Sequence, residues 1–248
     1  MTKKKNLSEE DLQAINLYEE TLAKKQNSNK FNLSEISIQV KCLNEKQKEL
    51  KKAIEEKDVV ICVGSAGTGK TFMSLLTALH LLKTESTFTK LILIKSLQVI
   101  KGEDIGLLPG TVYDKITPYM YSYTSNLDKI FGNSYVTKSF IDQGIIEMFP
   151  IAFCRGITFS KNICIIDEIQ NLTVHSFKTL ITRIGENSKM IFLGDDEQSD
   201  LKNPEESCIK KITKALSNNK HVKIIEFTDN ETVRNPIIKD IIRDLKCI

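Results

Sequence analysis

The stretch Val59–Leu82, VVICVGSAGTGKTFMSLLTALHLL, joins a short apolar run, a glycine-rich turn and an amphipathic segment. The run before the turn is rich in β-branched residues, which is typical of a buried strand, and the apolar residues after it recur at helical spacing. A strand, a glycine-rich turn and a helix in this order form the context in which phosphate-binding loops occur. The stretch therefore predicts a fold built around such a loop.

The turn matches the pattern G-x-x-x-x-G-K-[ST], and each residue type in it has a chemical reason. Small residues let several backbone N–H groups point at one phosphate, and the following helix adds its positive end. Lys70 is expected to reach the β- and γ-phosphates, and the Thr71 hydroxyl is expected to ligate the magnesium ion between them. The residues predicted to hold the nucleotide are Gly64, Ser65, Ala66, Gly67, Thr68, Gly69, Lys70 and Thr71.

Composition and charge indicate a soluble intracellular protein. The chain has 248 residues, of which 41% are hydrophobic and 27% charged, enough for one large domain with a substantial core. No apolar run is long enough to span a bilayer, and the first residues, MTKKKNLSEED, lack the apolar core of a signal peptide. We therefore expect a cytoplasmic protein with no membrane partner. The net charge of +3 permits a nucleic-acid partner without indicating one.

The cysteines and histidines predict neither a disulfide framework nor a metal centre. The six cysteines are scattered without a C-x-x-C pair, and several lie in apolar runs, so we expect reduced thiols in the core. The three histidines are isolated from one another. The cysteines are Cys42, Cys62, Cys154, Cys164, Cys208 and Cys247.

Residues 1–30 are expected to form a charged, helical N-terminal arm, and residues 31–248 are expected to form one domain. The apolar residues of the arm are spaced for a narrow helical stripe, and a polar break, KKQNSNK, follows them. An appendage, an oligomerisation helix, a partly disordered segment and a solvated helix packed on the domain all fit this pattern. A charged surface helix is expected over residues 43–56, directly before the first strand.

Apolar runs after the loop predict the remaining strands. They cover residues 90–95, 145–151, 163–167, 190–194 and 222–227, and amphipathic helical patterns at 174–185 and 206–216 lie between them. Strands that alternate with helices form parallel sheets covered by helices on both faces. The predicted fold class is therefore α/β, a P-loop nucleotide-binding fold.

A segment between the second and third strands, residues 101–120, is first rich in glycine and proline and then aromatic. It predicts a long ordered excursion followed by helix. Two uses fit the aromatic side chains, which either stack single-stranded bases beside Lys101 and Lys115 or pack in the core. These side chains are Tyr113, Tyr119, Tyr121, Tyr123 and Phe131.

Polar side chains follow two of the predicted strands where they end. Asp167 is expected to hold the magnesium ion through water, and Glu168 to polarise the attacking water as general base; a plain surface turn is the alternative. The next strand ends in GDDEQ, which brings Gln198 to the ligand crevice, where its amide suits contact with the γ-phosphate or the attacking water. A polar loop without such a contact also fits.

Two arginines flank these strands. Arg155 lies before the acidic strand, and Arg234 lies after the last strand. An arginine that reaches the γ-phosphate stabilises the charge of the transition state, whereas an ordinary surface ion pair is the alternative for each. We expect Arg155 among the nucleotide-binding residues and Arg234 among the catalytic ones.

In order and spacing, these segments resemble the PhoH-like ATPases, especially the short versions carried by bacteriophages, which would work in the host-cell cytoplasm. The LPG-containing and RG-x-T segments are those of this family rather than of P-loop proteins at large. The resemblance covers roughly residues 40–248 and is carried by GSAGTGKT, KGEDIGLLPGTVYDKITPYM, FCRGITF, IIDEIQN, LGDDEQSDL and TVRNPIIKDII.

The resemblance implies a RecA-like core, similar to the first ATPase domain of superfamily 1 helicases, that takes ATP and Mg²⁺. It implies that Gln47 reads the adenine, that Asp167 and Glu168 form the acidic motif, that Gln198 is a sensor and that Arg234 is an arginine finger. The chain departs from the family at 95–97, where Lys-Ser-Leu stands in place of a common Arg-Pro. The resemblance therefore does not carry a nucleic-acid or phosphate contact over to these positions.

The function expected first is a magnesium-dependent ATPase that moves or remodels single-stranded nucleic acid, with RNA favoured over DNA. A chain with one such core cannot close a nucleotide between two domains, so an Arg234 finger would reach a neighbouring subunit of a homo-oligomeric ring. The alternative is an ATP-gated binding module with slow hydrolysis. A nucleoside kinase is disfavoured, because nothing resembles an arginine-rich lid and the acidic pair suits water as the acceptor.

Overall fold

The computed structural model describes residues 31–96, 117–195, 198–199, 201 and 207–233. The expected N-terminal arm and the residues Lys101, Tyr113, Lys115, Arg234 and Cys247 lie outside this part of the chain. Among the described helices, none combines the length and the apolar character that a membrane span requires.

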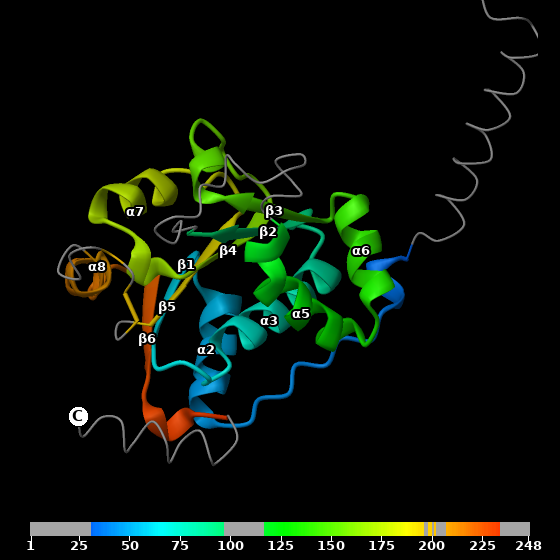
Figure 1. The fold of residues 1–248 in the computed structure, drawn as a ribbon, viewed down its shortest axis with the longest axis horizontal. Helices are drawn as coiled ribbons and strands as arrows, with labels where there is room; N and C mark the ends of the chain where they lie inside the picture. The colour runs from blue at the N-terminus through cyan, green and yellow to red at the C-terminus, as the bar shows by residue number, and fades with distance from the viewer. Residues whose placement is uncertain (1–30, 97–116, 196–197, 200, 202–206, 234–248) are drawn as a thin grey trace, which may run out of the picture.

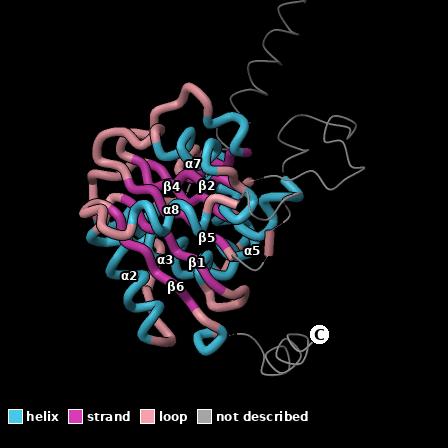
Figure 2. The backbone as a smooth tube through the Cα atoms, turned by 90° about the vertical axis from the view of Figure 1, so that its left-hand side faces the viewer, coloured by secondary structure: helices cyan, strands magenta, loops and turns pink. Residues whose placement is uncertain are grey.

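A parallel sheet of six strands forms the centre of the described chain, in the order β3-β2-β4-β5-β1-β6 (Figure 1). The loop-bearing strand β1 therefore lies between β5 and β6, as Figure 2 also shows. The predicted parallel α/β fold is confirmed, and each predicted strand is present. The strands are β1 (Val59–Gly64), β2 (Lys90–Lys95), β3 (Ile146–Pro150), β4 (Asn162–Asp167), β5 (Lys189–Gly194) and β6 (Val222–Phe227).

Helices cover both faces of the sheet, because the central strands carry apolar side chains on both sides. In β1, Val60 and Cys62 belong to one buried cluster, whereas Val59 and Ile61 belong to another on the opposite face. Helices α7 (Val174–Ile181) and α8 (Ile209–Leu216) cover the second cluster. The first cluster is covered by α2 (Glu45–Glu56), α3 (Lys70–Thr84), α5 (Tyr121–Phe131) and α6 (Ser134–Asp142).

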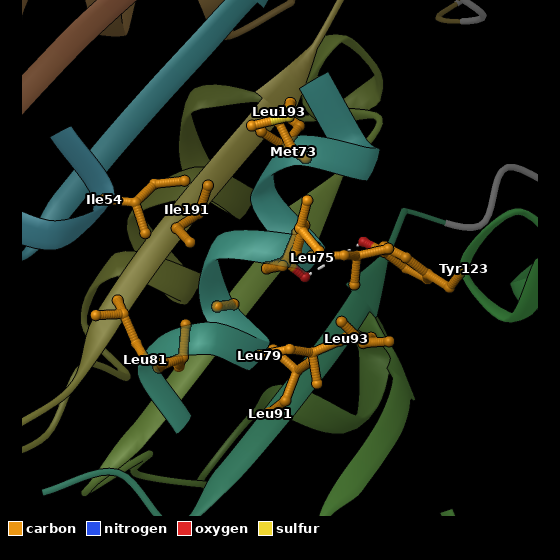
Figure 3. Packing of buried hydrophobic residues seen from close by; sticks show 14 of the residues in the cluster. Ile54, Met73, Leu75, Leu79, Leu81, Leu91, Leu93, Tyr123, Ile191 and Leu193 are labelled. Atoms are coloured by element: carbon orange, nitrogen blue, oxygen red, sulfur yellow. Dashed lines mark hydrogen bonds between the residues drawn. The ribbon is translucent and has the colours of Figure 1, made fainter. Parts of the chain in front are cut away.

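Helix α3, which follows the phosphate-binding loop, is packed in the middle of the first cluster. Its side chains Met73, Leu75 and Leu79 are at most 2% exposed, and they lie against residues of β2 and β5 (Figure 3). Burial of this much apolar surface holds the helix firmly on the sheet. The position of Lys70, the first residue of α3, is fixed as a result.

The predicted charged helix before β1 is confirmed as α2, but one stripe of it is core. Asn44 caps its start by accepting the N–H of Gln47 at 2.8 Å. Leu50 and Ile54 are fully buried, and the opposite face carries lysine–glutamate pairs one turn apart. The capped end of α2 lies beside the 3₁₀ turn η7 (Asp229–Glu231) that follows β6 (Figure 1).

The aromatic residues after β2 differ in how deeply they are buried. Tyr123 and Phe131 pack in the first cluster, and the Tyr123 hydroxyl donates to the carbonyl oxygens of Ile94 at 2.9 Å and Ile165 at 3.3 Å. Tyr121 is 70% exposed, at the start of α5. The core-packing alternative is therefore confirmed for Tyr123 and Phe131, whereas base stacking by Tyr121 stays a prediction.

Candidate functional site

The phosphate-binding loop connects β1 to α3 at the carboxyl edge of the sheet. Its glycines adopt backbone angles that other residues rarely take, with φ of 82° at Gly67 and 84° at Gly69. Gly69 is also the residue directly before α3. The loop conformation therefore depends on the glycines that the motif requires, and it leads into the positive end of a fifteen-residue helix.

Lys70 lies folded over the loop with its charge turned inward. Its Nζ donates to the carbonyl oxygens of Gly64 at 2.6 Å and of Ser65 at 2.8 Å. Burial is the main influence on this ammonium and lowers its pKa from the usual range. A poorly solvated cation at a helix N-terminus is well placed to gain energy from a phosphate anion.

Thr71 and Asp167, the two predicted magnesium ligands, are in direct contact. The Thr71 hydroxyl donates to Oδ2 of Asp167 at 3.0 Å, although 96 residues separate them in the chain. A hydroxyl and a carboxylate are hard oxygen donors of the kind that Mg²⁺ prefers, usually with waters and substrate phosphates completing the shell. The residues present therefore fit a magnesium ion at this position.

Asp167 is held in a position that disfavours its charge. Burial, and then the neighbouring charge of Glu168, raise the pKa of its carboxyl from 3.8 to about 6, against the lowering effect of the Glu168 N–H, Lys95 and Thr71. Between these two values the folded chain binds more protons than the unfolded chain, so this group makes stability fall as the pH rises from about 4 to above 6.

Asp167→Asn is expected to stabilise the protein measured without magnesium and nucleotide at pH 7.5, by at most about 3 kcal/mol, because the amide cannot ionise. Thermal unfolding followed by circular dichroism should show the melting temperature raised by several degrees. The gain should shrink as the pH is lowered towards 4. Mg²⁺ with ATP should stabilise the parent but not the variant.

The matched control for this prediction is Asp142→Asn, at an exposed position in α6, which should change stability by less than about 0.5 kcal/mol. An Asp167→Asn variant that melts at or below the parent's temperature at pH 7.5 would show that the Asp167 charge is well stabilised in the fold. The prediction would then be wrong.

Glu168 has an unusual backbone conformation and a partner near each oxygen of its carboxylate. Its φ is +61°, a left-handed conformation that costs a residue other than glycine about 1–2 kcal/mol. Its Oε2 accepts the Gln170 Nε2 at 2.7 Å, and its Oε1 lies 3.7 Å from the Lys95 Nζ. Strained backbone of this kind is concentrated at functional sites, which supports the choice of Glu168 as the candidate base.

Gln170 links this carboxylate to the loop after β5. The residue is only 2% exposed, and its Oε1 accepts the N–H of Asp195 at 3.1 Å. Its backbone oxygen also accepts the Ser199 hydroxyl at 3.3 Å. The buried amide thus connects the acidic motif to the segment that carries Gln198. Gln198 itself is exposed.

Gln47 supports the phosphate-binding loop from behind. Its Nε2 donates to the carbonyl oxygen of Thr68 at 3.1 Å, and its Oε1 accepts the N–H of Leu43 at 2.8 Å. The residue is 2% exposed. Both the nitrogen and the oxygen of its amide are therefore hydrogen-bonded within the chain. An adenine contact by Gln47 remains a prediction, and it would require one of these hydrogen bonds to be replaced by a hydrogen bond to the base.

The chain after β6 also reaches the loop. The N–H of Val233 donates to the carbonyl oxygen of Gly67 at 3.0 Å, and Asn44 at the cap of α2 contacts the carbonyl of Glu231 at 3.5 Å. Val233 directly precedes Arg234, which lies outside the described residues. The chain leading to the predicted arginine finger is thus anchored on the phosphate-binding loop of the same chain.

Arg155 lies apart from this group. It follows β3 and the 3₁₀ turn η4 (Ile151–Cys154) and is exposed. In the sheet, β3 lies two strand steps from β4 and four from β1, which corresponds to ~10 Å and ~19 Å at about 4.8 Å per strand. The loop, Thr71, Asp167 and Glu168 converge on one place, whereas Arg155 lies near the sheet edge with Phe153, which is 52% exposed.

The sequence patterns predicted no role for Gln170 or Val233, and Lys95 was noted only within the departure from the family at 95–97. Gln170 carried a weak signal, as an amide between apolar neighbours two residues after the candidate base. Lys95 carried another, as a charge at the end of a buried strand. Val233 carried none, because its contact is made by a backbone N–H that any residue except proline supplies.

Comparison with known proteins gives consistent matches. The model of the family described as PhoH-like protein matches residues 39–246. A PhoH-like protein of Bacillus subtilis (strain 168) is 34% identical over 226 residues, 91% of this chain and 67% of that protein. A PhoH-like protein of Mycobacterium bovis is 34% identical over 206 residues, 83% of this chain and 57% of that protein.

Among solved structures, the large terminase from a thermophilic bacteriophage is similar with a TM-score of 0.49 and 14% identity, over 82% of this chain and 50% of that one. The chain spans between half and about two thirds of the length of these three proteins. The family match extends from before the phosphate-binding loop to beyond Arg234 and includes every residue of the site above. The chain belongs to the PhoH-like protein family.

Proposed function

We propose that this protein is a magnesium-dependent ATP hydrolase that acts on single-stranded nucleic acid, with RNA favoured over DNA. The observation that carries the hydrolase half is the 3.0 Å contact between the Thr71 hydroxyl and Asp167, with Glu168 next in the chain. It brings a phosphate-binding loop, an oxygen donor pair for Mg²⁺ and a candidate base to one place. This is the set of groups that phosphoryl transfer to water needs.

Each group has a separate task in this proposal. Lys70 turns from its carbonyl partners to the β- and γ-phosphates, and the loop N–H groups orient the phosphate chain. A bound Mg²⁺, held by Thr71 and Asp167, would neutralise charge on the phosphates. Glu168 takes the proton of the attacking water, and Gln198 orients that water or senses the γ-phosphate.

The nucleic-acid half rests on the family resemblance and on exposed aromatic and basic side chains near β2 and β3. Tyr121 is 70% exposed and Phe153 is 52% exposed, and exposed Arg155 lies two residues from Phe153. Rings and arginines of this kind bind single strands by stacking and by contact with the backbone phosphates. This use of Arg155 stands beside the predicted contact with the nucleotide, because β3 lies two strand steps from β4, which leads into Glu168.

We also propose that Arg234 completes the site of a neighbouring subunit in a homo-oligomeric ring. The described chain contains one ATPase core, and a head-to-tail ring supplies a second wall to each nucleotide. Because Val233 is anchored on the phosphate-binding loop of its own chain, the alternative is that Arg234 contacts the nucleotide of its own subunit. Subunit mixing separates the two.

The test is steady-state phosphate release from ATP with magnesium, measured alone and with poly-U RNA or single-stranded DNA. The expected result is a rate that nucleic acid raises, with RNA the stronger activator. A slow rate that neither polymer changes would overturn the nucleic-acid function. An ATP-gated binding module would then be the better account.

Arg234→Ala is expected to lower the stimulated rate about a thousandfold, because an arginine finger contributes on that order to phosphoryl transfer. Mixing it with Glu168→Gln should restore part of the activity, since a mixed ring places an intact Arg234 beside an intact Glu168. If the mixture stays inactive although both variants form the parent's oligomer, the arginine acts within its own subunit. A monomer by light scattering in the presence of ATP would exclude the ring.

A further inference from the structure

Lys95 connects the candidate base to helix α5. It is the last residue of β2 and is paired in register with Asp167 of β4. Its Nζ lies 3.0 Å from the Ser122 hydroxyl and 3.7 Å from Oε1 of Glu168. The Lys95 side chain is 17% exposed, so it is shielded from solvent and its contacts are mainly with these protein groups.

With Lys95 on one oxygen and Gln170 on the other, the Glu168 carboxylate has a partner on each side. A general base needs an oxygen directed at the proton that it removes. The Glu168 side chain is 38% exposed, so water reaches it, but its carboxylate is oriented by Lys95 and Gln170. The Lys95 ammonium therefore competes with an attacking water for Oε1 of Glu168.

The two partners of the Glu168 carboxylate differ in how firmly their other contacts hold them. Gln170 is buried and holds the N–H of Asp195 with its other end, so it is fixed in place. Lys95 is hydrogen-bonded instead to Ser122, which follows the exposed Tyr121 in the first turn of α5. The Lys95 contact is therefore the one that an external ligand is able to reach.

The body of α5 is firmly held, which limits what such a ligand moves. Tyr123 is fully buried and bonded to the ends of β2 and β4. A ligand on Tyr121 therefore acts through side-chain changes at Ser122 and Lys95 rather than by displacing the helix.

We propose that Lys95 is a positioning residue that holds Glu168 away from the attacking water until single-stranded nucleic acid contacts the first turn of α5. This contact shifts the side chains of Ser122 and Lys95, which stay hydrogen-bonded to each other, away from Glu168. The shift leaves Oε1 of Glu168 free to accept the proton of water. This gate rests on the proposed ATPase and nucleic-acid functions and supplies a physical link between them.

Two variants test this gate, one by releasing Glu168 permanently and one by leaving it held by Lys95. Lys95→Met removes the hold on Glu168, so ATP hydrolysis without nucleic acid should rise about five- to tenfold and further stimulation should nearly vanish. Ser122→Ala leaves Lys95 on Glu168 but cuts its link to α5, so the unstimulated rate should be no higher than the parent's and stimulation should fall. A purely structural lysine would lower both rates together in the first variant.

The matched control is Lys90→Met, at the other end of β2, where the lysine pairs with Glu147 away from the site. It should keep the parent's stimulation ratio. Binding of fluorescently labelled oligo-uridine, followed by anisotropy, should change less than about twofold in Lys95→Met, because this shielded side chain is not itself a contact for the polymer.

A parent that nucleic acid does not stimulate overturns the nucleic-acid function and the gate with it. A stimulated parent whose Lys95→Met variant shows a lowered basal rate, or the parent's stimulation ratio, overturns the gate alone. If Lys95→Met proves unstable by thermal unfolding, Lys95→Gln, which keeps a donor to Ser122 but loses the charge, takes its place with the same expected results.

Discussion

Glu168→Gln should lower the rate of ATP hydrolysis by about 10²–10⁴-fold, the range over which a general base contributes. Glutamine has nearly the shape of glutamate and keeps an oxygen for the Gln170 Nε2, which lies 2.7 Å from the present carboxylate. It lacks the basic oxygen that accepts the proton of water. The substitution therefore tests the chemical role of Glu168 with little change of structure.

The measurements for this variant separate binding from hydrolysis. Fluorescent ATP analogues and thermal stabilisation by Mg²⁺-ATP should show binding close to that of the parent, because the loop and Thr71 are untouched. Glu147→Gln is the control, since this carboxylate on β3 pairs with Lys90 and not with the site. A Glu168→Gln variant that keeps a tenth or more of the parent's rate would show that another group activates the water.

The sheet was predictable from the sequence because its strands are buried on both faces. Such strands appear as continuous runs of branched apolar residues, so β1, β2 and β5 were located within a residue or two. The phosphate-binding loop was predictable because its glycines and lysine are fixed by local backbone geometry. Strand order was not predictable in this way, since it depends on pairing between distant segments.

Helix ends were less predictable, and tertiary contacts explain the errors. The apolar pattern at 174–185 predicts a helix to its end, but α7 stops at Ile181. After it, the N–H of Gly185 donates to the carbonyl oxygen of Phe159 at 2.8 Å, and Ile184 bridges to Phe159. A side chain at Gly185 would lie 2.2 Å from the Ser160 hydroxyl. The chain leaves the helix to make this pairing.

The contacts within the site depend on register and could not be read from the sequence. Lys95 meets Glu168 because β2 and β4 pair with Lys95 beside Asp167. A shift of one residue would turn the lysine to the opposite face. Gln170 and Val233 are similar cases, because each joins segments that are 25 residues or more apart. Sequence motifs identified the chemical groups, whereas the fold determines which of them touch.

The first glycine of the loop motif is the position where an added methyl group should do most damage to the fold. Gly64 has a φ of +129° and lies at the end of β1, paired with Phe227 of β6. A Cβ atom there would lie 1.9 Å from the carbonyl oxygen of Phe227 and 2.7 Å from its carbonyl carbon. These are backbone atoms of a paired strand, so they cannot move aside cheaply.

Gly64→Ala is therefore expected to destabilise the protein by about 4 kcal/mol or more, a loss that places it among the exceptional single substitutions. It should also abolish Mg²⁺-ATP binding, because relief of the clash separates β1 from β6 below the loop. Thermal unfolding, soluble yield and nucleotide-induced stabilisation measure these effects. A variant that melts within a few degrees of the parent would show that the backbone of β6 at Phe227 moves aside at little cost in stability.

Gly132→Ala separates the steric contact from the backbone requirement. Gly132 also has a positive φ, +70°, but an added Cβ there would meet no atom within 4 Å. Its substitution should therefore cost only the left-handed conformation, about 1–2 kcal/mol, and leave nucleotide binding intact. A large gap between the two variants would mean that the motif keeps its first glycine for the close approach of β6, in addition to any contact with phosphate.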